Sequence, residues 1–219
     1  MISKKAIGIL KSLILPIALY LFIFSPFYSE MDQHMEITIG YALLSFFIAS
    51  AELVTVILIM KLVNRIPLAE TGFFSFSPKT LLNLIPGMFL ILAIYLAGIL
   101  AVFLLTGSAD DPGIITVELK APVWMLSIMM LAVGYCEEFF FRFYLVETLG
   151  SVLGKKIAII ISAVFFALGH LYQGYLAATI IFFLALGFQW IYERYKSIHV
   201  NAIIHGLFDV VSVLLKGVV

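Results

Sequence analysis

Charged residues are scarce in this sequence, and cysteine is almost absent. Of the 219 residues 12% are charged, whereas soluble domains carry roughly 25%. The formal net charge is zero, so charge gives no reason to expect a nucleic acid as partner. The single cysteine, Cys136, excludes an internal disulfide and any zinc cluster built from cysteines. The sequence also lacks internal repeats, low-complexity tracts and loops long enough to form a soluble domain.

Hydrophobic residues, in contrast, are abundant: they make up 63% of the chain, and the mean hydropathy is +1.16. This composition predicts an integral membrane protein of the all-α class, a polytopic bundle in one membrane domain over residues 1–219. We expect about seven spans, or eight, because Pro86 and Gly87 lie near the start of one long run. The apolar runs of spanning length are 6–28, 37–60, 81–106, 122–149, 157–171 (the shortest), 176–192 and 199–215.

The charges between these runs predict the orientation. Basic and acidic connections alternate, and basic loops favour the cytoplasmic side. The N-terminus is therefore expected in the cytoplasm and the C-terminus outside, with the first run kept as an anchor rather than cleaved as a signal peptide. The basic set is Lys4, Lys5, Lys61, Arg65, Lys155, Lys156, Arg194 and Lys196; the acidic set is Glu30, Asp32, Glu36, Asp110, Asp111 and Glu118, with Lys120 as the exception.

Three charges interrupt the fourth apolar run, at Glu137, Glu138 and Arg142. An ionisable group at membrane depth costs about 2.5–3.5 kcal/mol, so the three together need a structural or chemical reason. On a helix Glu138 and Arg142 are i,i+4 neighbours and can neutralise each other, which favours a structural ion pair. Glu137 is rotated by about 100° from Glu138 and lacks that partner, which makes it a candidate general base.

Further polar residues follow in the later runs, where His170 ends the fifth, and His205 and Asp209 lie four residues apart in the last. At ~1.5 Å per residue, Glu137, His170 and His205 lie roughly 16, 20 and 12 Å from the predicted cytoplasmic ends of their helices. We therefore expect Glu137 and the two histidines, together with Asp209, to meet in one cavity near mid-membrane. Taken singly, either histidine could equally be an interhelical hydrogen-bonding residue, and Asp209 could merely neutralise His205.

Several other polar residues are given no catalytic role. Glu52 is interpreted as an isolated interhelical hydrogen-bonding residue, and Cys136 as a small packing residue rather than a nucleophile. His34 and His199 lie near membrane ends. The groups that remain can remove a proton from a water molecule and direct the water oxygen at a carbonyl carbon. Glu137, His170 and His205 could also hold a zinc ion with water as fourth ligand; the residues leave a metal-free and a zinc-activated water both open.

The polar residues of the later runs form three motifs, in the order Glu137-Glu138-x-x-x-Arg142, Phe166-x-x-x-His170 and His205-x-x-x-Asp209. These motifs resemble those of the CAAX-protease and bacteriocin-processing family, which includes the Ras-converting CAAX endopeptidases and bacterial self-immunity proteins. The resemblance implies an intramembrane endopeptidase with a catalytic core at 122–215, accessory helices at 1–121 and a cavity facing the cytoplasm. It further implies that Glu137 activates water with His170 as partner, that His205 stabilises the oxyanion, and that Glu138 and Arg142 hold the helix.

One position departs from the family pattern. The last motif residue is commonly Asn in the processing enzymes, whereas this chain has Asp209. An ionised carboxylate accepts hydrogen bonds and cannot donate one to an oxyanion, so Asp209 is expected to act through His205. The predicted function is hydrolysis of a peptide bond in a membrane-associated peptide or lipidated tail. The alternatives are a non-catalytic binding or regulatory protein of this fold and a proton or solute transporter.

Overall fold

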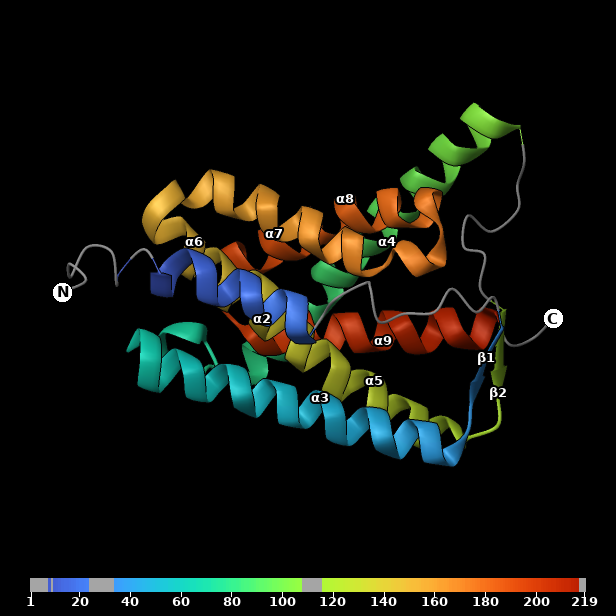
Figure 1. The fold of residues 1–219 in the computed structure, drawn as a ribbon. Coiled ribbons are helices and arrows are strands. Elements are labelled where there is room, and N and C mark those ends of the chain that lie inside the picture. Colours follow the sequence, from blue (N-terminus) through green and yellow to red (C-terminus); the bar gives the residue numbers. More distant parts are fainter. Residues whose placement is uncertain (1–7, 9, 24–33, 108–115, 217–219) are drawn as a thin grey trace.

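The computed structural model describes residues 8, 10–23, 34–107 and 116–216, and in them a helical bundle (Figure 1). Several residues of the predicted basic and acidic sets lie outside the described residues, as do the ends of the first apolar run: Lys4, Lys5, Glu30, Asp32, Asp110 and Asp111. The helices are η1 (Leu10–Ile14), α2 (Leu15–Ile23), α3 (Ile39–Ile59), η3 (Met60–Asn64), η4 (Leu68–Thr71), α4 (Pro78–Thr106), α5 (Val123–Glu138), η5 (Phe139–Leu145), α6 (Val146–Leu153), α7 (Lys155–Gly169), η6 (Leu171–Gln173), α8 (Tyr175–Tyr195) and α9 (Ile198–Lys216).

Five helical segments among these residues are long and apolar enough to cross a membrane: Ile39–Asn64, Pro78–Thr106, Val123–Leu153, Tyr175–Tyr195 and Ile198–Leu215. The chain is therefore a multi-pass integral membrane protein of the predicted all-α class. The two other predicted spans are shorter helices, Leu10–Phe22 in the described part of the first run and α7 with 15 residues.

The long segment Val123–Leu153 is continuous, but its middle is wound as the π-helix η5 directly after Glu138. Such π-helical insertions in α-helices are frequent at functional sites. All seven residues of η5 are buried. Five of them are aromatic, and the other two are Leu145 and the charged Arg142. The sequence pattern predicted a helix here and gave no sign of this change in winding.

A short parallel strand pair is an addition to the predicted all-α fold. Strand β1 (His34–Ile37) pairs with β2 (Thr116–Leu119), His34 lying opposite Thr116 and Ile37 opposite Leu119. The carbonyl of Ile37 also accepts hydrogen bonds from the backbone N–H groups of Lys120 and Ala121. The pair connects the start of α3 to the start of α5, at the end of the bundle that we name the strand end (right in Figure 1).

Close contact between α5 and α9 depends on two glycines. A Cβ atom added to Gly134 would lie 2.9 Å from the carbonyl oxygen of Ala202, and one added to Gly206 would lie 3.0 Å from the Cα atom of Leu131. Small residues let helix backbones approach in this way in membranes. The backbones of the two helices that carry Glu137, Glu138 and His205 are therefore in close contact.

The opposite end of the bundle, which we name the basic end, is filled by a core of aromatic and aliphatic side chains. Lys11 there donates a hydrogen bond to the carbonyl of Val63, and the Tyr144 hydroxyl donates one to Asn64. These bonds join η1, η3 and η5 across the end of the bundle. We call the buried core the aromatic cluster; its fully or almost fully buried members include Phe139, Phe140, Phe141, Phe143, Tyr144, Leu145, Leu149 and Phe166.

Candidate active site

The four residues predicted to meet at mid-membrane line one cavity. Glu137, His170, His205 and Asp209 all contribute to the wall of a space of about 290 Å³. Most of the remaining wall is apolar, with Met129, Ile180 and Phe188 among its members. Specific sites commonly have this character, an apolar lining with a few convergent polar groups. The predicted juxtaposition from three separate apolar runs is thus present in the structure.

The predicted ion pair of Glu138 and Arg142 is confirmed. The Arg142 Nε and one terminal nitrogen donate to the two Glu138 carboxylate oxygens at 3.0 and 3.2 Å, a bidentate contact. Both side chains are almost fully buried, at 0% and 1% exposure. The guanidinium carbon also lies 4.4 Å from the ring centre of Phe166, within cation–π range.

Glu138 accepts two further hydrogen bonds that the sequence did not suggest. The Asn201 amide donates to one oxygen at 2.9 Å, and His205 Nδ1 lies 2.9 Å from the other. A carboxylate can only accept, so the proton of this contact belongs to Nδ1. Glu138 therefore joins α9 to η5 and fixes the orientation of the His205 ring.

The other nitrogen of His205 faces the cavity carboxylates. Its Nε2 lies 3.3 Å from Asp209 and 3.6 Å from Glu137. The sequence interpretation had Asp209 holding one ring nitrogen while the other was left for an oxyanion. In the structure the nitrogen beside Asp209 is the one that faces Glu137, and the second nitrogen is bonded to Glu138. This part of the expected arrangement needs correction, because Glu138 reaches the ring from a helix whose packing the sequence does not specify.

His170 lines the same cavity. Its Nδ1 lies 2.8 Å from the backbone carbonyl of Phe166, the first residue of the second motif. Because a carbonyl can only accept, Nδ1 carries the proton, and the Nε2 of the neutral ring is left with a lone pair. This spacing follows from the end of α7, where His170 is the residue after the helix and reaches back one turn. Phe166 thereby sets the tautomer of His170.

Among the described residues Glu137 forms no ion pair with an arginine, as predicted, and its side chain is 19% exposed. It also borders a second space of about 270 Å³ on the side of α3, together with Glu52 and Cys136. The Cys136 thiol lies 3.8 Å from a Glu52 carboxylate oxygen, the contact distance of a weak sulfur donor. Glu52, interpreted from sequence as isolated, thus lies on the wall of a pocket that it shares with Glu137.

Asn201 is the site residue that the sequence reasoning missed. It is fully buried, and its amide donates to Phe188 as well as to Glu138. A usable signal was present, because Asn201, His205 and Asp209 are spaced i, i+4, i+8 and so share one face of α9. His199, given no role, is held at the basic end by hydrogen bonds with the Tyr135 hydroxyl and the Phe73 carbonyl.

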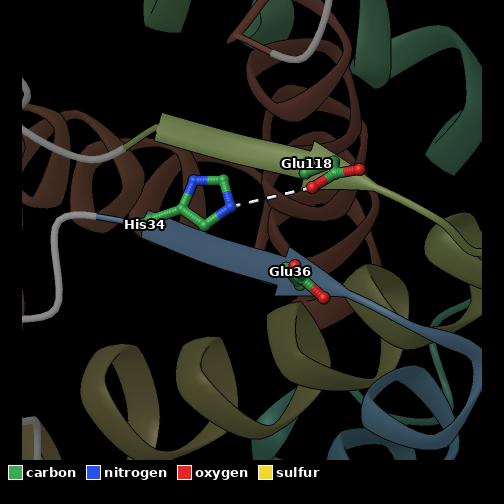
Figure 2. Close-up of side chains that lie close together, drawn as sticks. All are labelled: His34, Glu36 and Glu118. Atoms are coloured by element: carbon green, nitrogen blue, oxygen red, sulfur yellow. Dashed lines mark ion pairs between the residues drawn. The ribbon is translucent and has the colours of Figure 1, made fainter.

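The candidate zinc set does not form a close ligand group. Among the described residues one group has three ligand atoms within 4.8 Å of one another, and it is His34, Glu36 and Glu118 rather than Glu137, His170 and His205. Figure 2 shows that exposed group on β1 and β2, with His34 directed at Glu118. The Lys120 ammonium already lies 2.9 Å from Glu36 and 3.5 Å from Glu118, which supplies the positive charge. We therefore derive no catalytic step through a metal.

The cavity reaches toward the strand end. Met35 and Val117, which are register partners in the strand pair, both line it, as do Ser212 and Val213 near the end of α9. The basic connections lie at the opposite end. The cytoplasmic N-terminus and the cavity facing the cytoplasm both stay predictions.

The comparison with known families bears on the helices that form this site. The family model described as type II CAAX prenyl endopeptidase Rce1-like matches residues 119–211. The matched segment carries all three motifs and is similar to this family. Among curated proteins and among solved structures no match was found. This match confirms the predicted relation to CAAX proteases and suggests a peptidase activity at the membrane. The matched segment also contains all the motif residues that line the 290 Å³ cavity.

Proposed function

We propose that this protein is an intramembrane endopeptidase that hydrolyses a peptide bond in a membrane-associated peptide through a water activated by Glu137 and His170. The observation that carries the proposal is the common cavity, in which Glu137 is free of Arg142 while Glu138 neutralises it. Two adjacent carboxylates thereby have separate environments, one suited to proton transfer and one to holding the site together.

The first step is attack by water. Glu137 accepts one proton from the water, and the Nε2 lone pair of His170 accepts a hydrogen bond from its second O–H. The water oxygen forms a bond to the carbonyl carbon of the peptide, and the carbonyl electron pair moves to its oxygen. An imidazole and a carboxylate that face one water can act together in this way.

His205 then meets the charge that develops. Its Nδ1–H is bonded to Glu138, so Nε2 is the nitrogen directed at the cavity. When Nε2 carries a proton it donates to the oxyanion of the tetrahedral intermediate. A fixed donor of this kind stabilises the transition state without reorganisation at the moment of reaction. Glu138 keeps that donor in place, and Glu138 is itself held by Arg142 and Asn201.

The second step breaks the peptide. The oxyanion electron pair returns to carbon, the C–N bond breaks, and protonated Glu137 gives its proton to the leaving nitrogen. The products are a carboxyl end and an amine end, and Glu137 returns to its carboxylate form. Asp209 lies 3.3 Å from His205 Nε2 and is proposed to favour the protonated ring before substrate enters.

Peptide cleavage by purified protein in liposomes tests this scheme. Glu137→Gln keeps the size of the side chain and removes the base, so we expect a loss of about 10²–10⁴-fold in turnover, the usual contribution of general base catalysis. Glu147→Gln is the matched control, because Glu147 is exposed on α6 of the same long helical segment. Near-normal turnover of a folded Glu137→Gln protein would refute the scheme, and equal loss in both variants would show that the assay reports folding.

A further inference from the structure

His205 is the donor that the proposed scheme directs at the oxyanion. The carboxylate beside it, Asp209 at 3.3 Å from Nε2, can only accept hydrogen bonds when it is ionised. Sites that stabilise an oxyanion commonly direct more than one donor at it, and tyrosine hydroxyls are among the groups that serve. A second donor in this protein has to come from a side chain that reaches the cavity next to Glu137 and His170.

Tyr172 is held close to His170 by the turn η6. The backbone N–H of Gln173 donates to the His170 carbonyl, and that of Gly174 donates to the Leu171 carbonyl, both at 2.9 Å. The rings of Tyr172 and His170 lie 6.0 Å apart between centres and are inclined by 25°, so they are nearly parallel. The turn that follows α7 therefore places the Tyr172 ring alongside the imidazole proposed to contact the attacking water.

The Tyr172 side chain lines both spaces that border Glu137, the cavity of about 290 Å³ and the neighbouring space of about 270 Å³. The carboxylates of Glu137 and Asp209 are near enough to influence the charge on the Tyr172 hydroxyl. Asp209 in turn lies next to His205 Nε2, the first donor. The hydroxyl is therefore in the same part of the cavity as the proposed base and the first donor.

The hydrogen of this hydroxyl is available for a ligand in the cavity. Gln173 Nε2 donates a hydrogen bond to the hydroxyl oxygen at 3.2 Å, so the oxygen acts as an acceptor there. In the part of the chain that the structure describes, no group accepts a hydrogen bond from Tyr172 in return. A tyrosine hydroxyl carries its proton at neutral pH, and a bond accepted at the oxygen strengthens donation through the O–H.

We propose that Tyr172 is a second oxyanion donor, whose O–H donates a hydrogen bond to the carbonyl oxygen of the substrate beside the N–H of His205. The inference rests on the proposed function and adds a catalytic residue to it. No proton leaves Tyr172: its hydrogen bond strengthens as charge develops on the carbonyl oxygen, and it weakens when the electron pair returns to carbon and the C–N bond breaks. Proton transfer from water stays with Glu137.

Cleavage of an acylated apolar pentapeptide by purified protein in liposomes tests this role. Tyr172→Phe removes the hydroxyl and keeps the ring against His170. We expect kcat to fall by about 10²–10³-fold, the usual effect of losing one oxyanion donor, with KM little changed. Tyr175→Phe is the matched control, because Tyr175 is 84% exposed and lines neither space. An unchanged kcat in Tyr172→Phe, or an effect on KM alone, would overturn the proposal.

Gln173→Glu tests the direction of the hydrogen with Tyr172 intact. The amide that now donates to the hydroxyl is replaced by a carboxylate, which can only accept and therefore turns the O–H away from the substrate. We expect kcat to fall in this variant as well. Normal kcat in Gln173→Glu together with normal kcat in Tyr172→Phe would exclude any part of the Tyr172 hydroxyl in the reaction.

Binding of a phosphinic analogue of the same pentapeptide separates this inference from the proposed function. The analogue has a negatively charged phosphinate in place of the scissile carbonyl, and a control peptide has a methylene group there. We expect Tyr172→Phe to bind the phosphinic analogue about 10–100-fold more weakly than wild type, the effect of one hydrogen bond to a charged group, and the methylene peptide equally well.

Equal affinity of wild type and Tyr172→Phe for the phosphinic analogue would overturn the second donor, while Glu137-dependent cleavage would uphold the proposed function. The opposite result is equally distinct. Absence of cleavage by wild type in liposomes and in detergent, combined with phosphinate binding that depends on Tyr172, would count against the proposed function and support the assignment of the donor.

Discussion

Glu138 is expected to be the most important single side chain for the stability of the site. Its carboxylate is fully buried and accepts from Arg142 at 3.0 and 3.2 Å, from Asn201 at 2.9 Å and from His205 at 2.9 Å. Glu138→Gln leaves a buried guanidinium without its counter-charge. Breaking a buried pair from one side costs about 3–5 kcal/mol, and we expect a loss of that size in the free energy of unfolding.

Unfolding in mixed detergent micelles measures this loss, with Glu147→Gln as the exposed control, which should remain within about 0.5 kcal/mol of wild type. The double variant Glu138→Gln/Arg142→Gln removes both charges. Because the penalty comes from an unpaired buried charge, the double variant should be less destabilised than Glu138→Gln plus Arg142→Gln taken together, by 0.5–3 kcal/mol. A cost below about 1 kcal/mol for Glu138→Gln, or strict additivity in the double variant, would refute the reasoning.

Three further outcomes are expected. Asp209→Asn, which keeps a hydrogen-bonding group 3.3 Å from the His205 ring, should retain much of the peptidase rate, whereas Asp209→Leu should lose most of it; equal losses would mean that the charge itself is required. Gly206→Leu should separate α5 from α9, because even a Cβ atom there would lie 3.0 Å from the α5 backbone. We expect the free energy of unfolding to fall by more than about 2 kcal/mol, whereas the control Leu207→Ala, on the exposed face of α9, should change it little. The hydrogen bond from Lys120, with its charge, lowers the pKa of Glu36, so wild type should be more stable than Glu36→Gln at neutral pH. This difference should be lost as the pH falls from the pKa of an ordinary glutamate through the lowered pKa of Glu36. A pH-independent difference would show that the ion pair does not contribute.

The helical class, the ion pair and the meeting of Glu137, His170, His205 and Asp209 could be predicted because each depends on spacing along one helix or on depth in the membrane. Glu138 and Arg142 are four residues apart, and that distance alone brings them together on a helix. Depth likewise limits which residues of different spans can meet, since helix rise is constant. The confirmed relation to CAAX proteases depended on the same three motifs.

The remaining features depend on rotation of one helix against another, which spacing does not encode. Spacing along a helix could not predict that His205 Nδ1 would point at Glu138 rather than at Asp209, or that Glu52 would share a pocket wall with Glu137. The strand pair was missed because four-residue strands such as His34–Ile37 are too short to show a period. The direction of the cavity opening was inferred from family resemblance alone, and it stays a prediction, because spacing along a helix does not encode it.

The aromatic cluster has a consequence for the energy stored across the membrane. An elementary charge that crosses a membrane potential of 100 mV releases about 2.3 kcal/mol, so a water-filled path past Glu137 and Asp209 from one face to the other would conduct protons and dissipate that gradient continuously. The buried rings of Phe139, Phe140 and Tyr144 close one end of any such path. Ionisable groups at mid-membrane can therefore meet water from one side, while the packed rings prevent a continuous water path and the membrane stays electrically sealed.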